Sequence, residues 1–355
     1  MARIESDGDS DAPFTDDQWE GLMAGLLISR VVADRCEAEF ARVQGETDLT
    51  LELNIVPEVE GVFLEPEDLA RVEIAFFSGD MLADEGTLAR RFFGAALRAP
   101  NLKWMHASNA GIDDPVFGRV LEAGARLSNS SGSSAEPIAQ TAIGGMLALS
   151  RGFPAWGDAQ RDREWRPLEQ AATPADLGTQ TVVVVGLGAI GGHIARLSQA
   201  LGLHVIGVRR SPQRPGDPVD EMVTPADLAS VLPRADWLAL AMPLTDETRD
   251  MISAEAIALL PKGARILNVA RGQVIDEGAM IDALRSGALG GAYLDVFDTE
   301  PLPSESPLWE LPNVIVTPHN SSASLGNNER STLMFLTNLD HWARDEPLEN
   351  EVSER

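Results

Sequence analysis

Residues 181–191 read TVVVVGLGAIG, so a run of β-branched residues leads directly into the pattern G-x-G-x-x-G. In this pattern Gly186 permits a tight turn, Gly188 lets the backbone approach a phosphate, and Gly191 lets the following helix pack closely. The start of that helix offers N–H groups and the positive end of a dipole to an anion. A turn without a ligand is the alternative. The sequence predicts a dinucleotide site at Gly186, Gly188, Ala189, Ile190 and Gly191.

The end of the next predicted strand, 203–208, favours NADP(H) over NAD(H). A site selective for NAD has an Asp or Glu about 20 residues after the glycines, which accepts a hydrogen bond from the ribose 2′-OH. No carboxylate stands there, and the chain continues with Arg209, Arg210 and Ser211. Arginine presents a planar fork of donors that suits a 2′-phosphate. We therefore expect NADPH as the preferred cofactor, with NAD as the second cofactor and a solvated basic turn as the alternative.

The composition limits the partners of the chain. The 355 residues include 55 Asp and Glu against 28 Lys and Arg, which gives a formal net charge of −27. A surface of this charge repels nucleic acid and anionic membranes, so we expect neither as a partner. Lys103 and Lys262 are the only lysines. High acidity together with so little lysine resembles proteins from halophiles that accumulate salt.

Cysteine usage and hydropathy predict a cytoplasmic protein. Cys36 is the only cysteine, which excludes an intrachain disulfide and a thiolate metal cluster, and we expect no metal. No run of residues approaches the length of 18 apolar residues that marks a membrane span. The acidic, polar residues 1–22 have no apolar segment of the signal-peptide type, and we expect them to form an extension.

Apolar runs alternate with helical patterns along the chain, which predicts an α/β fold with parallel sheets. The predicted strands are 26–29, 51–55, 72–77, 102–106, 181–185, 203–208, 237–241, 265–269, 291–296 and 314–317, and the main predicted helices are 32–43, 137–149 and 327–344. We expect two Rossmann-like or flavodoxin-like domains, with the cofactor domain inserted into a discontinuous substrate domain. The predicted boundaries are 23–136 plus 321–355 for the substrate domain and 137–320 for the dinucleotide-binding domain.

Several motifs in the second half of the chain occur in a fixed order. They are AMPLT at 241–245, NVARG at 268–272, LDVF at 294–297, TEPL at 299–302 and TPH at 317–319. Together with the glycine pattern, these motifs resemble the D-isomer-specific 2-hydroxyacid dehydrogenase family over roughly residues 102–322. The branch that the chain is most similar to is that of the glyoxylate and hydroxypyruvate reductases.

This resemblance implies three catalytic residues. Arg271 would bind the substrate carboxylate and polarise the carbonyl group. His319 would donate the proton to the carbonyl oxygen, and Glu300 would hold its imidazole ring and stabilise the protonated form. Each has a structural alternative: a salt bridge for Arg271, a solvated loop for Glu300 and a structural histidine for His319. His106 is the second choice as proton donor.

The resemblance also implies further binding residues. Asp295 would contact the nicotinamide carboxamide, or else cap the following turn. The other cofactor contacts implied in this half of the chain are Met242, Pro243, Thr248, Val269 and Ala270. In the first half, residues 108–113 resemble the substrate loop of the family. Its members Asn109, Ala110 and Gly111 would bind the substrate carboxylate opposite Arg271, with His319 at the reacting carbonyl.

The leading hypothesis is an NADPH-preferring reductase of small 2-keto acids such as glyoxylate or hydroxypyruvate, with the corresponding 2-hydroxy acid as product. Asn109, Gln140 and Asn320 depart from the residues frequent in the family, which leaves the substrate open. An NAD-linked D-2-hydroxyacid dehydrogenase is one alternative. A non-catalytic, nucleotide-sensing interaction protein of the corepressor type is another. By resemblance alone we also expect a homodimer.

Overall fold

The computed structural model describes residues 22–59, 61–83, 86–112, 114–168 and 173–352. The chain divides into unit 1, residues 1–130 with 328–355, and unit 2, residues 131–327. Unit 1 is therefore discontinuous, with unit 2 inserted into it. These divisions lie six to seven residues from the predicted boundaries. Of the predicted extension 1–22, residues 1–21 lie outside the described part, and Leu22 begins the first strand.

Unit 1 is built on a five-stranded parallel sheet in the order β2-β1-β3-β4-β5. Its strands are β1 (Leu22–Ile28), β2 (Leu49–Ile55), β3 (Val72–Phe77), β4 (Trp104–Ala107) and β5 (Arg126–Asn129). Its helices are α1 (Arg30–Arg35), α2 (Glu37–Glu46), α3 (Pro66–Arg71), α4 (Thr87–Ala96), α5 (Pro115–Glu122) and α12 (Asn327–Ala343).

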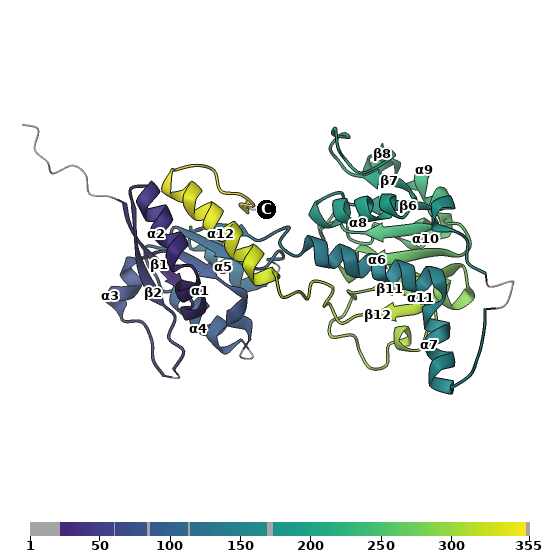
Figure 1. The fold of residues 1–355 in the computed structure, drawn as a ribbon, viewed down its shortest axis with the longest axis horizontal. Coiled ribbons are helices and arrows are strands. Elements are labelled where there is room, and N and C mark those ends of the chain that lie inside the picture. The colour runs from purple at the N-terminus through teal and green to yellow at the C-terminus, as the bar shows by residue number, and fades with distance from the viewer. Residues whose placement is uncertain (1–21, 60, 84–85, 113, 169–172, 353–355) are drawn as a thin grey trace, which may run out of the picture. The chain divides into compact units, whose positions relative to one another are not determined.

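The two faces of this sheet carry separate apolar clusters. Residues of α4 and α5 pack on one face, and residues of α1, α2 and α12 pack on the other. Figure 1 shows α12, in yellow, beside the purple N-terminal helices. Phe335 of α12 stacks on Phe76 of β3 with ring centroids 4.2 Å apart. The last helix of the chain is thus part of the core of unit 1.

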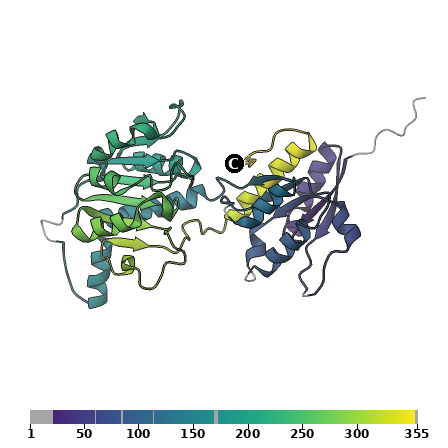
Figure 2. The same ribbon diagram turned by 180° about the vertical axis from the view of Figure 1, so that it is seen from behind.

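Unit 2 contains a seven-stranded parallel sheet in the order β12-β11-β10-β9-β6-β7-β8, seen from behind in Figure 2. The strands are β6 (Thr181–Val185), β7 (His204–Val208), β8 (Glu221–Val223), β9 (Trp237–Leu240), β10 (Ala264–Asn268), β11 (Leu289–Leu294) and β12 (Val314–Val316). The helices are α6 (Ala135–Arg151), α7 (Phe153–Asp162), α8 (Ala189–Ala200), α9 (Leu228–Val231), α10 (Ala254–Leu259) and α11 (Glu277–Ser286).

The order of these strands reverses at β6. After β6 the chain adds β7 and β8 on one side, and it then crosses to add β9 to β12 on the other. In open α/β sheets the crevice at the carboxyl ends of the strands beside such a reversal is where ligands bind. The glycine turn that follows β6 lies at this point.

The predicted α/β fold with two parallel sheets is confirmed, and the differences are local. The predicted helix 32–43 is two helices, because the backbone of Cys36 (φ −105°, ψ 17°) departs from helical geometry between α1 and α2. The strands β5 and β8 were not predicted. Strand β5 reads RLSN and β8 has only three residues, so neither has the apolar pattern of a buried strand. Among the described residues, no helix has the length and apolar character needed to cross a membrane.

Candidate active site

The three glycines of the G-x-G-x-x-G turn have different surroundings. Gly186 has a φ of +91°, and a Cβ atom there would lie 2.7 Å from the Met242 nitrogen. A Cβ atom at Gly191 would lie only 1.8 Å from the carbonyl oxygen of Gly186. At Gly188 a Cβ atom would meet nothing within 4 Å. Two of the glycines are therefore required by packing within the protein, whereas Gly188 faces open space.

The open position lies at the start of a helix. Gly188 is the N-cap of α8 and has no side chain that could accept from the first N–H groups. Ala189 is exposed, Ile190 is partly exposed, and the first turn of α8 contains no acidic residue. These groups, together with the positive end of the helix dipole, can receive a phosphate of a dinucleotide.

The loop after β7 places Arg209 differently from the expectation. Its guanidinium group donates to both carboxylate oxygens of Asp217, from Nη2 at 2.7 Å and from Nη1 at 3.2 Å. It also donates to the carbonyl oxygens of Pro212 (2.7 Å) and Ser211 (3.3 Å). The side chains of Arg209 and Asp217 are each only 16% exposed. The hydrogen bond from Arg209 is the main reason why the pKa of Asp217 is lowered. Arg209 thus closes the loop 209–217.

Arg210 is one of two exposed arginines in this loop, and Arg214 is the other. The side chain of Arg210 is 84% exposed, and its nearest ion-pair partner is Glu247 at 3.7 Å, itself 76% exposed. An ion pair at this distance and exposure holds the side chain only weakly. Ser211 is partly buried beside it.

The loops after β9 and β10 hold the other predicted cofactor residues. Met242 is buried and Pro243 follows it directly after β9. The hydroxyl group of Thr248 donates to the carbonyl oxygen of Pro243 at 2.7 Å, which closes this loop. Val269 and Ala270, directly after β10, are buried. All of them follow the carboxyl ends of strands near the reversal point of the sheet.

Asn268 at the end of β10 shapes the loop that presents Arg271. Its Nδ2 donates to the carbonyl oxygen of Arg271 at 3.1 Å, and its Oδ1 accepts from the N–H of Ala270 at 3.0 Å. One N–H of the Arg271 guanidinium group donates to the carbonyl oxygen of Ala270 at 2.8 Å. The prediction did not assign a role to Asn268, although its place in the NVARG motif marked it.

Gly272 joins the Arg271 loop to the loop that carries Glu300. A Cβ atom at Gly272 would lie 1.8 Å from the carbonyl carbon of Phe297, so only glycine fits. The side chain of Gln273 adds a hydrogen bond of 2.7 Å to the carbonyl oxygen of Asp298. The backbone of the Arg271 loop therefore rests directly on the backbone of the Glu300 loop.

The structure brings His319 and Glu300 together. The Nδ1 of His319 lies 2.7 Å from the Oε2 of Glu300, while the Oε1 accepts from the N–H of Phe297 at 3.0 Å. An ionised carboxylate only accepts hydrogen bonds, so Nδ1 carries the hydrogen and Nε2 is the ring nitrogen available for proton transfer. The His319 side chain is 47% exposed. This is the geometry of an imidazole held by a carboxylate for acid–base work.

Asp295 is buried and accepts several hydrogen bonds from the loop around His319. Its Oδ1 accepts from the Thr317 hydroxyl (2.6 Å), the Asn320 N–H (2.9 Å) and the Ser321 N–H (3.1 Å). Its Oδ2 accepts from the N–H of Ser321 at 3.2 Å and from the hydroxyl of the same residue. These donors belong to the loop after β12, so Asp295 caps that loop and not the turn that directly follows it in the chain.

The predicted substrate loop belongs to unit 1 and follows β4. The carbonyl oxygen of Asn109 accepts from the N–H of Ser130 at 3.1 Å, and that of Ala110 accepts from the side chain of Asn129 at 2.9 Å. These bonds fix the loop that contains Asn109, Ala110 and Gly111 on the end of β5.

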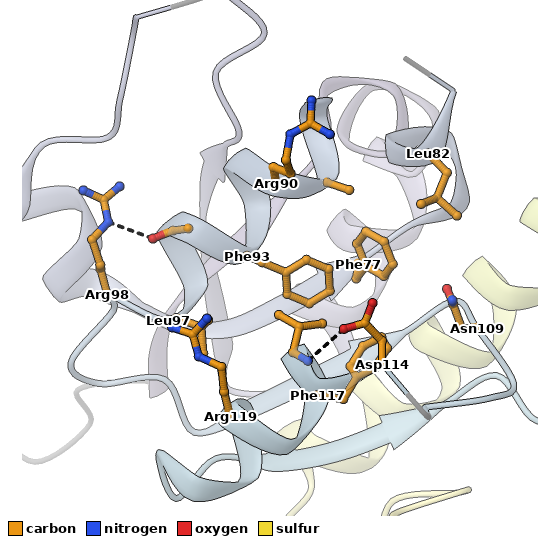
Figure 3. Close-up of a pocket in the computed structure, with 13 residues that line it drawn as sticks. Phe77, Leu82, Arg90, Phe93, Leu97, Arg98, Asn109, Asp114, Phe117 and Arg119 are labelled. Carbon is orange, nitrogen blue, oxygen red and sulfur yellow. Dashed lines mark hydrogen bonds between the residues drawn. The ribbon is translucent and has the colours of Figure 1, made fainter. Parts of the chain in front are cut away.

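A groove of about 540 Å³ also lies in unit 1, between α4 and α5. Figure 3 shows Phe77, Phe93 and Phe117 at its centre, with Asn109 at one end. Three arginines also line it: Arg90, Arg98 and Arg119. None of the residues that line it is among the predicted catalytic residues.

His106 does not suit the role of proton donor. It is fully buried, and its ring nitrogens lie 2.7 Å from the Ser128 hydroxyl and 3.0 Å from the Ser130 hydroxyl. Burial lowers the pKa of His106 to about 3, so the ring is neutral at physiological pH. The part of the chain that the structure describes contains no group of three or more His, Cys, Asp or Glu residues that could hold a metal ion.

Comparison with known proteins identifies the family. Residues 143–321 match the description "D-isomer specific 2-hydroxyacid dehydrogenase, NAD binding domain". The chain is 33% identical to D-3-phosphoglycerate dehydrogenase of Methanocaldococcus jannaschii, over 72% of this chain and 48% of the relative. It is 31% identical to glyoxylate reductase of Aeropyrum pernix, over 70% of this chain and 75% of the relative.

A solved structure agrees with this match over nearly the whole chain. A D-isomer specific 2-hydroxyacid dehydrogenase from Xanthobacter autotrophicus, in complex with NADPH and MES, is 29% identical with a TM-score of 0.71. The alignment covers 93% of this chain and 98% of that protein. The chain belongs to the D-isomer specific 2-hydroxyacid dehydrogenase family.

Proposed function

We propose that the chain is an NADPH-preferring reductase of small 2-keto acids, with glyoxylate and hydroxypyruvate as the first substrates to test. The observation that carries this proposal is the pairing of His319 with Glu300 at 2.7 Å, in the same unit as Arg271 and the glycine turn. An anion-binding fork, an imidazole held by a carboxylate and a dinucleotide site are what the reduction of a 2-keto acid requires.

The glycine turn fits a dinucleotide on structural grounds. Gly188 leaves open space at the start of α8, while Gly186 and Gly191 are closed by the protein itself. Pyrophosphate would bind at this N-terminus, held by the N–H groups of Ala189 and Ile190. The chemistry that NADPH would supply at this site is a hydride for the carbonyl carbon of the substrate.

The protein residues would act on the other parts of the substrate. Arg271 would bind the carboxylate and polarise the carbonyl group, because its guanidinium group offers several N–H donors in one plane. The Nε2 of His319 would give its proton to the carbonyl oxygen as the hydride arrives. Glu300 would hold Nδ1 and balance the positive charge of the ring before the transfer. In the oxidative direction His319 would accept the proton.

Within the loop after β7, we assign the 2′-phosphate to Arg210 and Ser211. Arg209 is already bonded to both oxygens of Asp217, whereas Arg210 is exposed. A guanidinium group that is free to turn can form two hydrogen bonds with a phosphate. The NADPH-bound relative from Xanthobacter autotrophicus supports this preference.

The second candidate is an NAD-linked D-2-hydroxyacid dehydrogenase. The observation that favours it is the Arg209–Asp217 pair, which neutralises the guanidinium group nearest the end of β7. The sensing protein without activity has no comparable observation in its favour. A homodimer, a cytoplasmic location and a requirement for salt stay predictions.

The experiment is the oxidation of NADPH and of NADH with a panel of glyoxylate, hydroxypyruvate, pyruvate and longer 2-keto acids. His319→Ala tests the proton donor, and His204→Ala, at an exposed histidine that begins β7, is the matched control. We expect turnover that prefers NADPH, is lost in His319→Ala and persists in His204→Ala. A higher kcat/KM with NADH than with NADPH would favour the second candidate, the NAD-linked D-2-hydroxyacid dehydrogenase. Tight cofactor binding without turnover on any substrate would favour the sensing protein.

A further inference from the structure

The loop that carries His319 is held at its flanking residues. His319 itself has a φ of +49°, in the left-handed region that side chains other than glycine rarely adopt. Its N–H donates to the carbonyl oxygens of Asp295 (2.8 Å) and Thr317 (3.0 Å). Such a backbone conformation persists only where the surrounding contacts enforce it.

The Asp295 carboxylate supplies these contacts on both sides of the histidine. It accepts from the Thr317 side chain before His319 and from the Asn320 and Ser321 N–H groups after it. A single buried carboxylate therefore determines the course of the backbone around His319. Removing the Thr317 hydroxyl would leave part of a buried charge without a partner.

The hydrogen bonds around Thr317 have a defined direction. The Thr317 hydroxyl has one proton, and it donates this proton to Asp295 at 2.6 Å because a carboxylate can only accept. The hydroxyl of Tyr293 lies 2.9 Å from the same Thr317 oxygen. Tyr293 must then be the donor in this second bond. The protons thus point from Tyr293 to Thr317 and from Thr317 to Asp295.

Tyr293 is suited to remain a donor. The residue is 1% exposed, and burial raises the pKa of its hydroxyl to about 12, which keeps the proton in place at all working pH values. Its ring packs against Gly145 of α6, where a Cβ atom would lie 2.5 Å from the ring. On the same helix, the Thr141 hydroxyl shares its proton between the carbonyl oxygens of Pro137, at 2.9 Å, and Ser321, at 3.2 Å. Helix α6 therefore supports both Tyr293 and the far side of the loop.

We propose that Tyr293 and Thr317 are positioning residues, which set the place of the His319 imidazole through the hydrogen-bonded chain Tyr293–Thr317–Asp295. This inference rests on the proposed role of His319 as proton donor. It assigns no contact with substrate to either residue. Because Tyr293 packs tightly against Gly145, helix α6 supports the Tyr293 end of this series of hydrogen bonds.

Three substitutions test the hydrogen bonds that link Tyr293, Thr317 and Asp295. Thr317→Val removes the hydroxyl at nearly constant volume, Thr317→Ser keeps it, and Tyr293→Phe removes only the terminal donor. Because a misplacement of about 1 Å can cost about 100-fold in rate, we expect kcat to fall about 10- to 100-fold in Thr317→Val. Thr317→Ser should recover most of the loss, and Tyr293→Phe should show a smaller loss. The KM for NADPH should not change. Thr179→Val, at an exposed threonine bonded to the carbonyl oxygen of Asp176, is the matched control.

A second measurement does not depend on turnover. In ¹⁵N-histidine-labelled protein, the Nδ1–H signal of His319 reports its hydrogen bond to Glu300, and His319→Gln assigns it. We expect this signal in the native protein and in Thr317→Ser, and its loss or broadening in Thr317→Val. An unchanged signal and unchanged kcat in Thr317→Val, with only the melting temperature lowered, would overturn the positioning role. If the native protein turns over no 2-keto acid but the signal still responds to Thr317→Val, the proposed function fails while the positioning stands.

Discussion

Arg209 and Asp217 form an ion pair with two hydrogen bonds, of 2.7 and 3.2 Å, in the loop that follows β7. The pair turns the arginine that follows β7 into a structural part of its loop. In the proposed function, the selectivity between NADPH and NADH therefore depends on the next residue, Arg210, whose side chain is exposed.

Substitution of Arg210 should therefore change the cofactor preference. We expect Arg210→Ala to lower kcat/KM for NADPH by about 10- to 100-fold, since a charge-assisted hydrogen bond to a phosphate is lost, and to leave NADH nearly unaffected. Arg209→Ala should instead lower the melting temperature and weaken both cofactors, because it opens the loop. Kinetics with both cofactors separate the two outcomes. A selective loss of NADPH in Arg209→Ala alone would contradict this assignment.

Gly188 and Gly191 of the turn allow a matched pair of alanine substitutions. In Gly188→Ala the new methyl group meets no protein atom within 4 Å, so the fold should persist while the methyl group excludes the pyrophosphate. In Gly191→Ala it would lie 1.8 Å from a carbonyl oxygen, so the protein should be destabilised. Thermal melting and NADPH titration measure both variants. NADPH binding that survives in Gly188→Ala would argue against a dinucleotide at this turn.

The negative charge of Glu300, and not only the shape of its side chain, should be needed for a high kcat. Glu300→Gln can keep a hydrogen bond to His319 but cannot balance a protonated ring, so we expect kcat to fall by about 100-fold. Glu305→Gln, at an exposed carboxylate five residues later, is the control and should be neutral. Steady-state kinetics over a range of pH provide the comparison. Equal rates in the two variants would remove Glu300 from the mechanism.

His106 should make unit 1 sensitive to acid. The pKa of its ring is lowered to about 3 in the folded protein, from the model-compound value of 6.5, so the unfolded chain binds more protons between these values. The contribution of neutral, buried His106 to the free energy of unfolding is therefore fully present above pH 6.5. It is lost as the pH falls toward 3, at up to about 1.4 kcal/mol per pH unit. Denaturant unfolding of native protein and His106→Asn at several pH values tests this. The pH slope should be smaller in His106→Asn, and identical slopes would refute the prediction.

Salt should stabilise the protein. With a net charge of −27, repulsion between carboxylates is strong in dilute buffer, and it weakens as the Debye length falls from about 10 Å at 0.1 M to about 3 Å at 1 M salt. We expect the melting temperature to rise by several degrees between about 0.1 and 2 M KCl. A melting temperature that does not change with the concentration of KCl would refute the proposed adaptation to salt.

The sequence allowed the fold to be predicted where most residues of a strand are apolar. Strand β3 was expected at 72–77 and is found at Val72–Phe77, because five of its six residues are apolar and buried in the sheet. Strand β5 was missed because the buried state of Ser128 depends on its bonds to Trp104 and His106, which no local pattern reveals. Short strands at the edge of a sheet are likewise defined by their contacts with the neighbouring strand and not by a local sequence pattern.

The candidate site was predictable where each residue sits in a local motif. Arg271, Glu300 and His319 each follow a strand or a turn of recognisable sequence, and the structure places Glu300 beside His319. The partner of Arg209 was not predictable, since Asp217 is one of many acidic residues in the chain and only the folded loop selects it. The bonds from Tyr293 and Thr317 also depend on pairing between strands.

The insertion of unit 2 into unit 1 has a consequence for synthesis on the ribosome. Residues 1–130 emerge first, but the helix that covers one face of their sheet begins only at Asn327. At about 5–20 residues per second, the intervening segment delays this helix by roughly 10 to 40 s. During that time Phe76 and Trp104 lack the aromatic ring of Phe335 that later stacks on both. The nascent chain therefore passes through a period in which its first 130 residues need protection from aggregation while the inserted unit 2 can already fold.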